Sequence, residues 1–193
     1  MRRAAAAAAA LLALTACNGG SGGGRDPGPT DDPLPQIATD ACPGPDDLLA
    51  EQATSGRRLP DTTLPCLGHA GEVRMRALGK HPYVVNLWAS WCGPCKDEMP
   101  AFQSVKHDLG TKVRFLGVNT RDRERNARAI VQNTAITYAS VVDRDGKVQN
   151  ALGARSLPTT ALIGADGRIK TIHVGELTGP ELRALIEQHL GVT

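Results

Sequence analysis

The amino-acid sequence predicts an α/β fold, a three-layer sandwich with a mixed central sheet, over residues 59–193. Two apolar, β-rich runs at 83–89 and 113–118 alternate with segments of helical periodicity, which is typical of strands buried on both sheet faces. Two further runs at 159–163 and 169–174 flank Ala165-Asp166-Gly167, a strong hairpin turn signal. The alternation of helices and strands predicts parallel neighbours in the sheet, and the hairpin predicts an antiparallel edge.

The remaining elements follow from turn and capping signals along the chain. An Asp pair before Leu48-Leu49 indicates one short helix, and the helix that begins at the cysteine pair 92–95 should end near Leu109. Pro180 suits the first position of a C-terminal helix. The other expected elements are a hairpin of strands 63–67 and 73–78, a helix at 123–133, a strand at 140–142 and the C-terminal helix at 181–190.

The N-terminus has the features of a secretory signal peptide over residues 1–16. Arg2 and Arg3 precede an apolar run of eleven residues, Ala4 to Leu14, which is far shorter than the ~20 residues of a spanning helix. The sequence Leu14-Thr15-Ala16-Cys17 resembles the lipobox of bacterial lipoproteins. That resemblance implies cleavage before Cys17 and acylation of its sulfur, and therefore contact with a lipid bilayer. Ordinary signal cleavage beside an incidental cysteine is the alternative.

Residues 17–36 are rich in Gly, Pro, Ser and Asp and predict a flexible linker, followed by an N-terminal extension at 37–58. The formal net charge is only +2, and removal of Arg2 and Arg3 brings the 22 basic residues to 20, equal to the 20 acidic ones. Aromatic residues make up only 3% of the chain. Charge and composition therefore argue against nucleic acid as a partner. A monomer is expected.

The cysteines suggest one reactive pair and one remaining pair. Apart from Cys17, the chain has Cys42, Cys66 and the C-x-x-C pair Cys92 and Cys95. A compartment outside the membrane permits disulfides, so a structural Cys42–Cys66 bond is the preferred reading. Two free buried thiols, or a second redox pair that relays electrons, are the alternatives.

Cys92 lies where a buried strand should lead directly into a helix. Amide groups and the helix dipole at that point stabilise negative charge and lower a thiol pKa, so Cys92 is the expected nucleophile. Cys95 lies one turn further and can close onto a mixed disulfide. Gly93 permits the tight backbone, and Pro94 is tolerated in a first helical turn.

The run Trp91-Cys92-Gly93-Pro94-Cys95 is similar to the thioredoxin active-site sequence, and Pro100 matches the proline that kinks the thioredoxin helix. The loop 156–160 resembles the thioredoxin loop whose cis-proline, here Pro158, faces the cysteines. This resemblance implies a thioredoxin-like fold, and substrate binding by Trp91, Gly93, Pro94, Leu157 and Pro158. A cis bond at Pro158 would expose the Leu157 backbone to an extended substrate.

Within that superfamily, residues 86–100 resemble the membrane-anchored TlpA/ResA group. Asn86 stands where thioredoxin has a buried Asp, and Glu98 stands three residues after Cys95. The resemblance implies a lipid-anchored thiol-disulfide oxidoreductase on the extracytoplasmic face of the cell membrane, with Glu98 as a catalytic proton carrier. It further implies no cofactor beyond the Cys92–Cys95 disulfide, a membrane redox partner, and reduction of protein substrates such as apocytochrome c thiols. Oxidation of secreted proteins on the same site is the alternative.

Other functions of cysteine-containing folds fit less well. A peroxidase of this architecture would need Thr at position 89, which is Ala, and a c-type haem site would need His at position 96, which is Lys. No residues have the spacing of a zinc site, so no metal is expected. A structural C-x-x-C in a binding lipoprotein would not need Gly-Pro between the sulfurs. The basic run 121–128 is most simply a solvated face, with recruitment of an acidic partner as the alternative.

Overall fold

The computed structural model describes residues 34–49 and 56–193, and the expected signal peptide, Cys17 and most of the linker lie outside these ranges. Five strands form the central sheet in the order β5-β4-β3-β6-β7. Their bounds are β3 (Tyr83–Trp88), β4 (Arg114–Thr120), β5 (Ser140–Asp143), β6 (Thr159–Ile163) and β7 (Ile169–Val174). β3, β4 and β5 are parallel, whereas β6 and β7 pair antiparallel at the other edge. The predicted mixed sheet and its antiparallel edge are thus confirmed.

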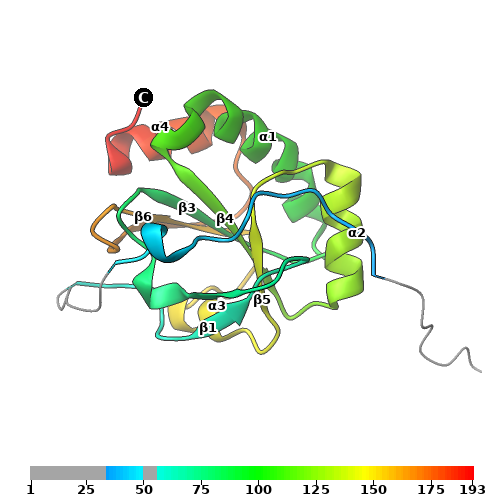
Figure 1. Cartoon of the computed structure of the whole chain (residues 1–193). Helices are drawn as coiled ribbons and strands as arrows, with labels where there is room; N and C mark the ends of the chain where they lie inside the picture. Colours follow the sequence, from blue (N-terminus) through cyan, green and yellow to red (C-terminus); the bar gives the residue numbers. More distant parts are fainter. Residues whose placement is uncertain (1–33, 50–55) are drawn as a thin grey trace, which may run out of the picture. The chain divides into compact units, whose positions relative to one another are not determined.

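Helices on one face of the sheet and a smaller layer on the other bury the strands (Figure 1). α1 (Gly93–Leu109), α2 (Glu124–Thr134) and α4 (Gly179–Leu190) share one apolar core with alternate residues of β3 and β4. α3 (Lys147–Leu152), together with β1 (Thr63–Pro65) and β2 (Glu72–Arg74), covers the opposite face. β3 and β4 are buried along almost their whole length and are accordingly mostly apolar, whereas β7 at the edge has no fully buried residue.

Close packing between β3, β4 and β5 explains one glycine in the sheet. A Cβ at Gly117 would lie 2.2 Å from the Ser140 hydroxyl and 2.7 Å from Trp88 Nε1. Trp88 is fully buried and is one of the largest core side chains. The absence of a side chain at position 117 therefore gives Trp88 its place in the core.

Several expected element bounds were wrong in detail. The second strand of the N-terminal hairpin ends at Arg74, because Met75–Ala77 form a 3-10 turn, η2. The short helix expected after Asp46 is also a 3-10 turn, η1 (Pro45–Asp47), and η3 (Gly110–Lys112) follows α1. α3 was not predicted: its first amides, of Lys147 and Val148, donate to the Asp143 carboxylate, at 2.7 and 3.0 Å.

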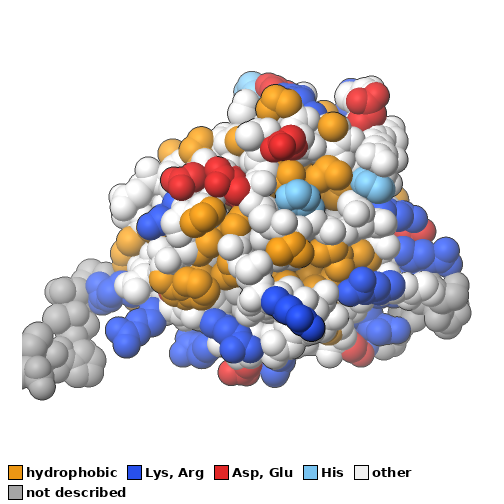
Figure 2. Space-filling model, turned by 180° about the vertical axis from the view of Figure 1, so that it is seen from behind, with side chains coloured by type: hydrophobic (Ala, Val, Ile, Leu, Met, Phe, Trp, Pro, Cys, Tyr) orange, Lys and Arg blue, Asp and Glu red, His pale blue; other side chains and the backbone are white. Residues whose placement is uncertain are grey.

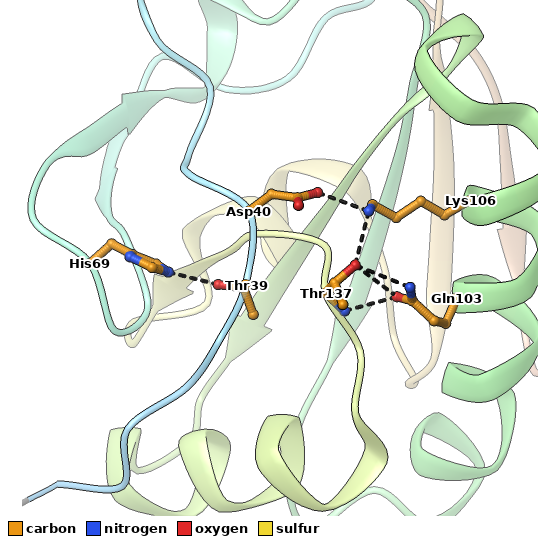
Figure 3. Close-up of polar contacts among 6 residues, drawn as sticks. All are labelled: Thr39, Asp40, His69, Gln103, Lys106 and Thr137. Atoms are coloured by element: carbon orange, nitrogen blue, oxygen red, sulfur yellow. Dashed lines mark hydrogen bonds and ion pairs between the residues drawn. The ribbon is translucent and has the colours of Figure 1, made fainter.

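The N-terminal extension lies along the domain as part of one compact unit, Leu34–Thr193. The Asp40 amide donates to the Thr137 carbonyl at 2.6 Å, and the Asp40 carboxylate pairs with Lys106 at 2.9 Å (Figure 3). The same close-up shows Thr39 in contact with His69, with Oγ1 and Nε2 2.8 Å apart. Polar contacts thus join the extension to α1, to the β1–β2 hairpin and to the loop before β5.

A disulfide between Cys42 and Cys66 makes this attachment covalent, with Cα atoms 6.3 Å apart. Cys66 forms a bridge with Val141 of β5, so the bond joins the extension to the edge of the sheet. The predicted pairing is confirmed, and the alternative of two free thiols is wrong. Within the described part of the chain, no helix has the length and apolar character needed to cross a membrane.

Candidate active site

The cysteine pair lies at the junction of β3 and α1, as the sequence predicts. Cys92 is the N-cap residue of α1, and its Sγ accepts a hydrogen bond from the Cys95 amide at 3.3 Å. The two sulfurs are bonded, with Cα atoms 5.4 Å apart. The amide and the positive end of the helix dipole would stabilise a thiolate at Cys92 once the bond is reduced.

The two sulfurs differ in their access to solvent. Cys92 is 5% exposed and Cys95 is fully buried, whereas the neighbouring Trp91 is 63% exposed. Gly93 and Pro94 are also exposed. Cys92 can therefore be approached from solvent across a surface made by these three neighbours, while Cys95 is protected behind it.

The loop before β6 closes the site from the other side. The peptide bond between Leu157 and Pro158 is cis. Leu87 of β3 pairs with Thr159, so Pro158 lies at the same end of the sheet as Cys92. Pro158 is buried and its carbonyl accepts a bond from the Gly175 amide at 3.0 Å, whereas Leu157 is half-buried. The cis bond that the resemblance to the thioredoxin loop implies is thus present, at the end of the sheet where Cys92 lies.

Glu98 is buried behind Cys95 with only 1% of its surface exposed. Asn86 Nδ2 donates to its Oε1 at 2.8 Å, and the Leu177 amide donates to its Oε2 at 3.0 Å. Burial raises the pKa of Glu98 to about 7, although these two hydrogen bonds act in the opposite direction; the charge of Glu176 adds to the rise. A carboxyl with this pKa can both take up and release a proton near neutral pH.

The turn that carries Trp91 and Cys92 depends on Asp122, which sequence reasoning missed. The Asp122 carboxylate accepts bonds from the Ser90 amide at 2.5 Å and from the Ser90 hydroxyl at 2.7 Å. Asn119 Nδ2 also donates to it, at 2.9 Å. A positional signal was available in the sequence. Ser90 follows the buried parallel strand β3 and Asp122 follows β4, and functional side chains commonly gather beyond the ends of such strands.

The described residues contain no group of His, Cys, Asp and Glu side chains that could hold a metal ion. The site itself consists of the Cys92–Cys95 disulfide and the buried carboxyl of Glu98 on the same helix. Such a disulfide carries two electrons itself and needs no other group to exchange them.

Comparisons with known proteins agree with this geometry. The model of the AhpC/TSA family matches residues 55–172. Thioredoxin-like protein YneN of Bacillus subtilis is 30% identical over 135 residues, 68% of this chain and 78% of YneN. Thiol-disulfide oxidoreductase ResA of Geobacillus kaustophilus is 33% identical over 138 residues, 70% of this chain and 75% of ResA.

A solved structure of DsbF from Mycobacterium tuberculosis has a TM-score of 0.61 at 23% identity, covering 66% of this chain and 94% of that one. This similarity supports the thioredoxin-like fold. The family match spans more than half of the chain, and the named relatives include thiol-disulfide oxidoreductases. The protein therefore belongs to the AhpC/TSA family of thioredoxin-like proteins and is a thiol-disulfide oxidoreductase.

Proposed function

We propose that this enzyme reduces disulfides of extracytoplasmic proteins, with Cys92 as nucleophile and Cys95 as resolving thiol. The observation that carries the proposal is the Cys95 amide donating to Cys92 Sγ at the N-terminus of α1. This contact favours negative charge on the more accessible sulfur, which is the one that a client must meet first.

The exchange takes two steps that balance in electrons and protons. The Cys92 thiolate attacks one client sulfur, and the other client sulfur leaves as a thiolate that takes up a proton. Cys95 then loses its proton and attacks Cys92 Sγ, which releases the second client thiol and forms the Cys92–Cys95 bond. The client gains two electrons, and a membrane redox partner returns two electrons to the enzyme.

Glu98 is proposed to accept the proton of Cys95 in the second step. It lies one helical turn beyond Cys95 and is buried with it. A carboxylate there also disfavours a thiolate at Cys95 and so favours the disulfide over the reduced pair. A pair whose reduced form is disfavoured gives up electrons readily, which supports reduction as the direction of the reaction.

The location and domain division are proposed from the sequence. A signal peptide at 1–16, acylation of Cys17 and a linker at 17–36 would anchor the extension 37–58 and the catalytic domain 59–193 to the outer side of the cell membrane. The Cys42–Cys66 bond fits an oxidising compartment, where structural disulfides persist. Apocytochrome c in which the cysteine thiols have been oxidised to a disulfide is a proposed client class, and the enzyme is proposed to act as a monomer.

Peroxidase activity is the less favoured function on this fold. Position 89 is a buried alanine, which provides no hydroxyl to hold a peroxide beside Cys92. Thiol-disulfide exchange needs no such group.

The test uses the mature chain and a disulfide-containing peptide, with thiol release followed over time. Cys92→Ser should abolish exchange, whereas Cys95→Ser should accumulate a mixed disulfide through Cys92. A double variant Cys42→Ser and Cys66→Ser serves as control and should keep the exchange activity. Faster alkylation of Cys95 than of Cys92 in the reduced enzyme at mildly acidic pH would show that the nucleophile is wrongly assigned.

The direction is tested by the redox potential of the Cys92–Cys95 pair. A value near about −270 mV would support a reductant, and a value near about −120 mV would support the oxidant alternative.

A further inference from the structure

A groove beside the Cys92–Cys95 bond has features that the exchange chemistry does not require. It encloses about 470 Å³, and its lining includes the exposed Trp91, which precedes Cys92. Arg121 and Arg155 are also part of the lining, together with Gln149 and Asn150 of α3. Residues from three separate segments thus meet around Trp91, the residue that precedes the more accessible cysteine in the chain.

Arg121 is held in place at this groove. Its Nη2 donates to Asn150 Oδ1 at 3.0 Å, and its Nε lies 2.3 Å from where a Cβ on Gly146 would be. Its backbone carbonyl accepts the Trp91 indole N–H at 3.2 Å. A guanidinium has five N–H donors, so Arg121 keeps donors for a ligand after these contacts.

The positive charge of the groove is not neutralised by its own lining, which contains no Asp or Glu. Asp122 accepts bonds from Ser90 and Asn119, and Asp143 accepts bonds from the first amides of α3. Arg155 is exposed and makes no hydrogen bond or ion pair within residues 34–49 and 56–193. Two arginines therefore face a space without a matching carboxylate.

Gln149 adds an acceptor that lacks a donor. Its Oε1 is buried and has no hydrogen-bond partner in the described structure. A turn of the Gln149 side chain toward the groove that it lines would bring this oxygen to a peptide N–H, which would remove the free-energy cost of burying it without a partner. Arg155 lies two residues before Leu157, so the last residue of the groove lining is close in the chain to the cis-proline loop.

We propose that this groove binds an acidic segment of the client protein that flanks the cysteines to be reduced. Client carboxylates pair with Arg121 and Arg155, and a client backbone amide donates to Gln149. Trp91 supplies an apolar surface for the stems of the same side chains. The inference rests on the proposed function, because it names the class of client that this site prefers.

One face of the molecule also carries basic side chains (Figure 2). Lysine and arginine side chains gather along the lower edge of the molecule, the edge near α3 in Figure 1, below a band of apolar side chains (Figure 2). Basic groups on this face can attract an acidic segment at low salt.

The test compares two disulfide peptides of the same length with the mature enzyme. They differ only in Glu or Gln at positions at least four residues from the cysteines, so that both react equally with dithiothreitol. Each exposed ion pair contributes about a 1.5- to 5-fold change, so the Glu peptide should have about a 3- to 10-fold higher kcat/KM. Added salt at ~0.5 M should remove most of this preference.

The double variant Arg121→Gln and Arg155→Gln should reduce the Glu preference, the ratio of the two kcat/KM values, to within about two-fold. Arg76→Gln is the matched control, since this exposed arginine lies in η2, outside the groove lining, and should keep the preference. Equal rates for both peptides with the unaltered enzyme would overturn the groove proposal alone. Exchange with neither peptide would overturn the proposed function and, with it, the groove.

Discussion

The buried carboxyl of Glu98 makes a pH-dependent contribution to the stability of this enzyme. Burial raises its pKa from 4.5 to about 7 in the folded state. A carboxyl whose folded pKa is raised binds its proton more tightly when folded. Its contribution is therefore fully present below about pH 4.5 and is lost as the pH rises through about 7. The size of that loss is about 3 kcal/mol, from 1.36 kcal/mol per pKa unit.

Glu98→Gln removes this pH dependence at the cost of a hydrogen bond. Glutamine has one acceptor oxygen for the two donors that Glu98 satisfies, Asn86 Nδ2 and the Leu177 amide. The loss of this hydrogen bond should lower the free energy of unfolding by about 1 kcal/mol at every pH. At about pH 5 the variant should therefore be less stable than the unaltered enzyme, and at about pH 8 it should be more stable by about 2 kcal/mol.

Urea unfolding of the oxidised protein between about pH 5 and 8 measures this crossing. Glu187→Gln, which removes an exposed carboxylate from α4, is the matched control and should give a profile parallel to that of the unaltered enzyme. Parallel profiles for Glu98→Gln as well would refute the reasoning, because they would mean that Glu98 does not titrate in this range in the folded state.

Other perturbations test the framework around the site. Replacing both Cys42 and Cys66 by Ala opens a loop of 23 intervening residues and should lower the free energy of unfolding by about 3 kcal/mol. The exchange rate should not change. A loss of exchange activity in this variant would instead favour an electron relay through Cys42 and Cys66. Gly117→Ala should lower the free energy of unfolding, measured in urea, by about 1–3 kcal/mol, because the new Cβ would collide with the Ser140 hydroxyl and with Trp88. An unchanged urea midpoint would contradict that packing. Asp122→Ala should leave the Ser90 amide without its partner and slow exchange severalfold, with most of the fold stability kept. Normal kinetics for this variant would mean that the turn does not depend on Asp122.

The sequence by itself determined the features whose causes are local. A strand that runs into Cys92 at a helix start, the short spacing to Cys95 and the turn at 165–167 depend on neighbours in the chain. The structure has each of them where it was expected. The Cys42–Cys66 pairing also followed, because removing the reactive pair and Cys17 from five cysteines leaves only these two.

Short elements could not be predicted with the same success. α3 has six residues, too few to show a helical period, and its first amides are satisfied by Asp143 from the preceding strand. The end of β2 at Arg74 was also missed. The residues that follow it, Met75–Ala77, are compatible with a strand but form a 3-10 turn.

Tertiary structure alone decided the environment of Glu98 and the composition of the groove. Lys96, Asp97 and Glu98 are three consecutive charged residues, and the sequence does not show which of them is buried. Only Glu98 is, and its carboxylate accepts a hydrogen bond from the Leu177 amide, 79 residues further along the chain. Arg121 and Arg155 likewise belong to different loops, which meet only because β4 ends and β6 begins at the same end of the sheet. Burial and long-range contact depend on which surfaces pack together, and a local pattern of residue types does not contain that information.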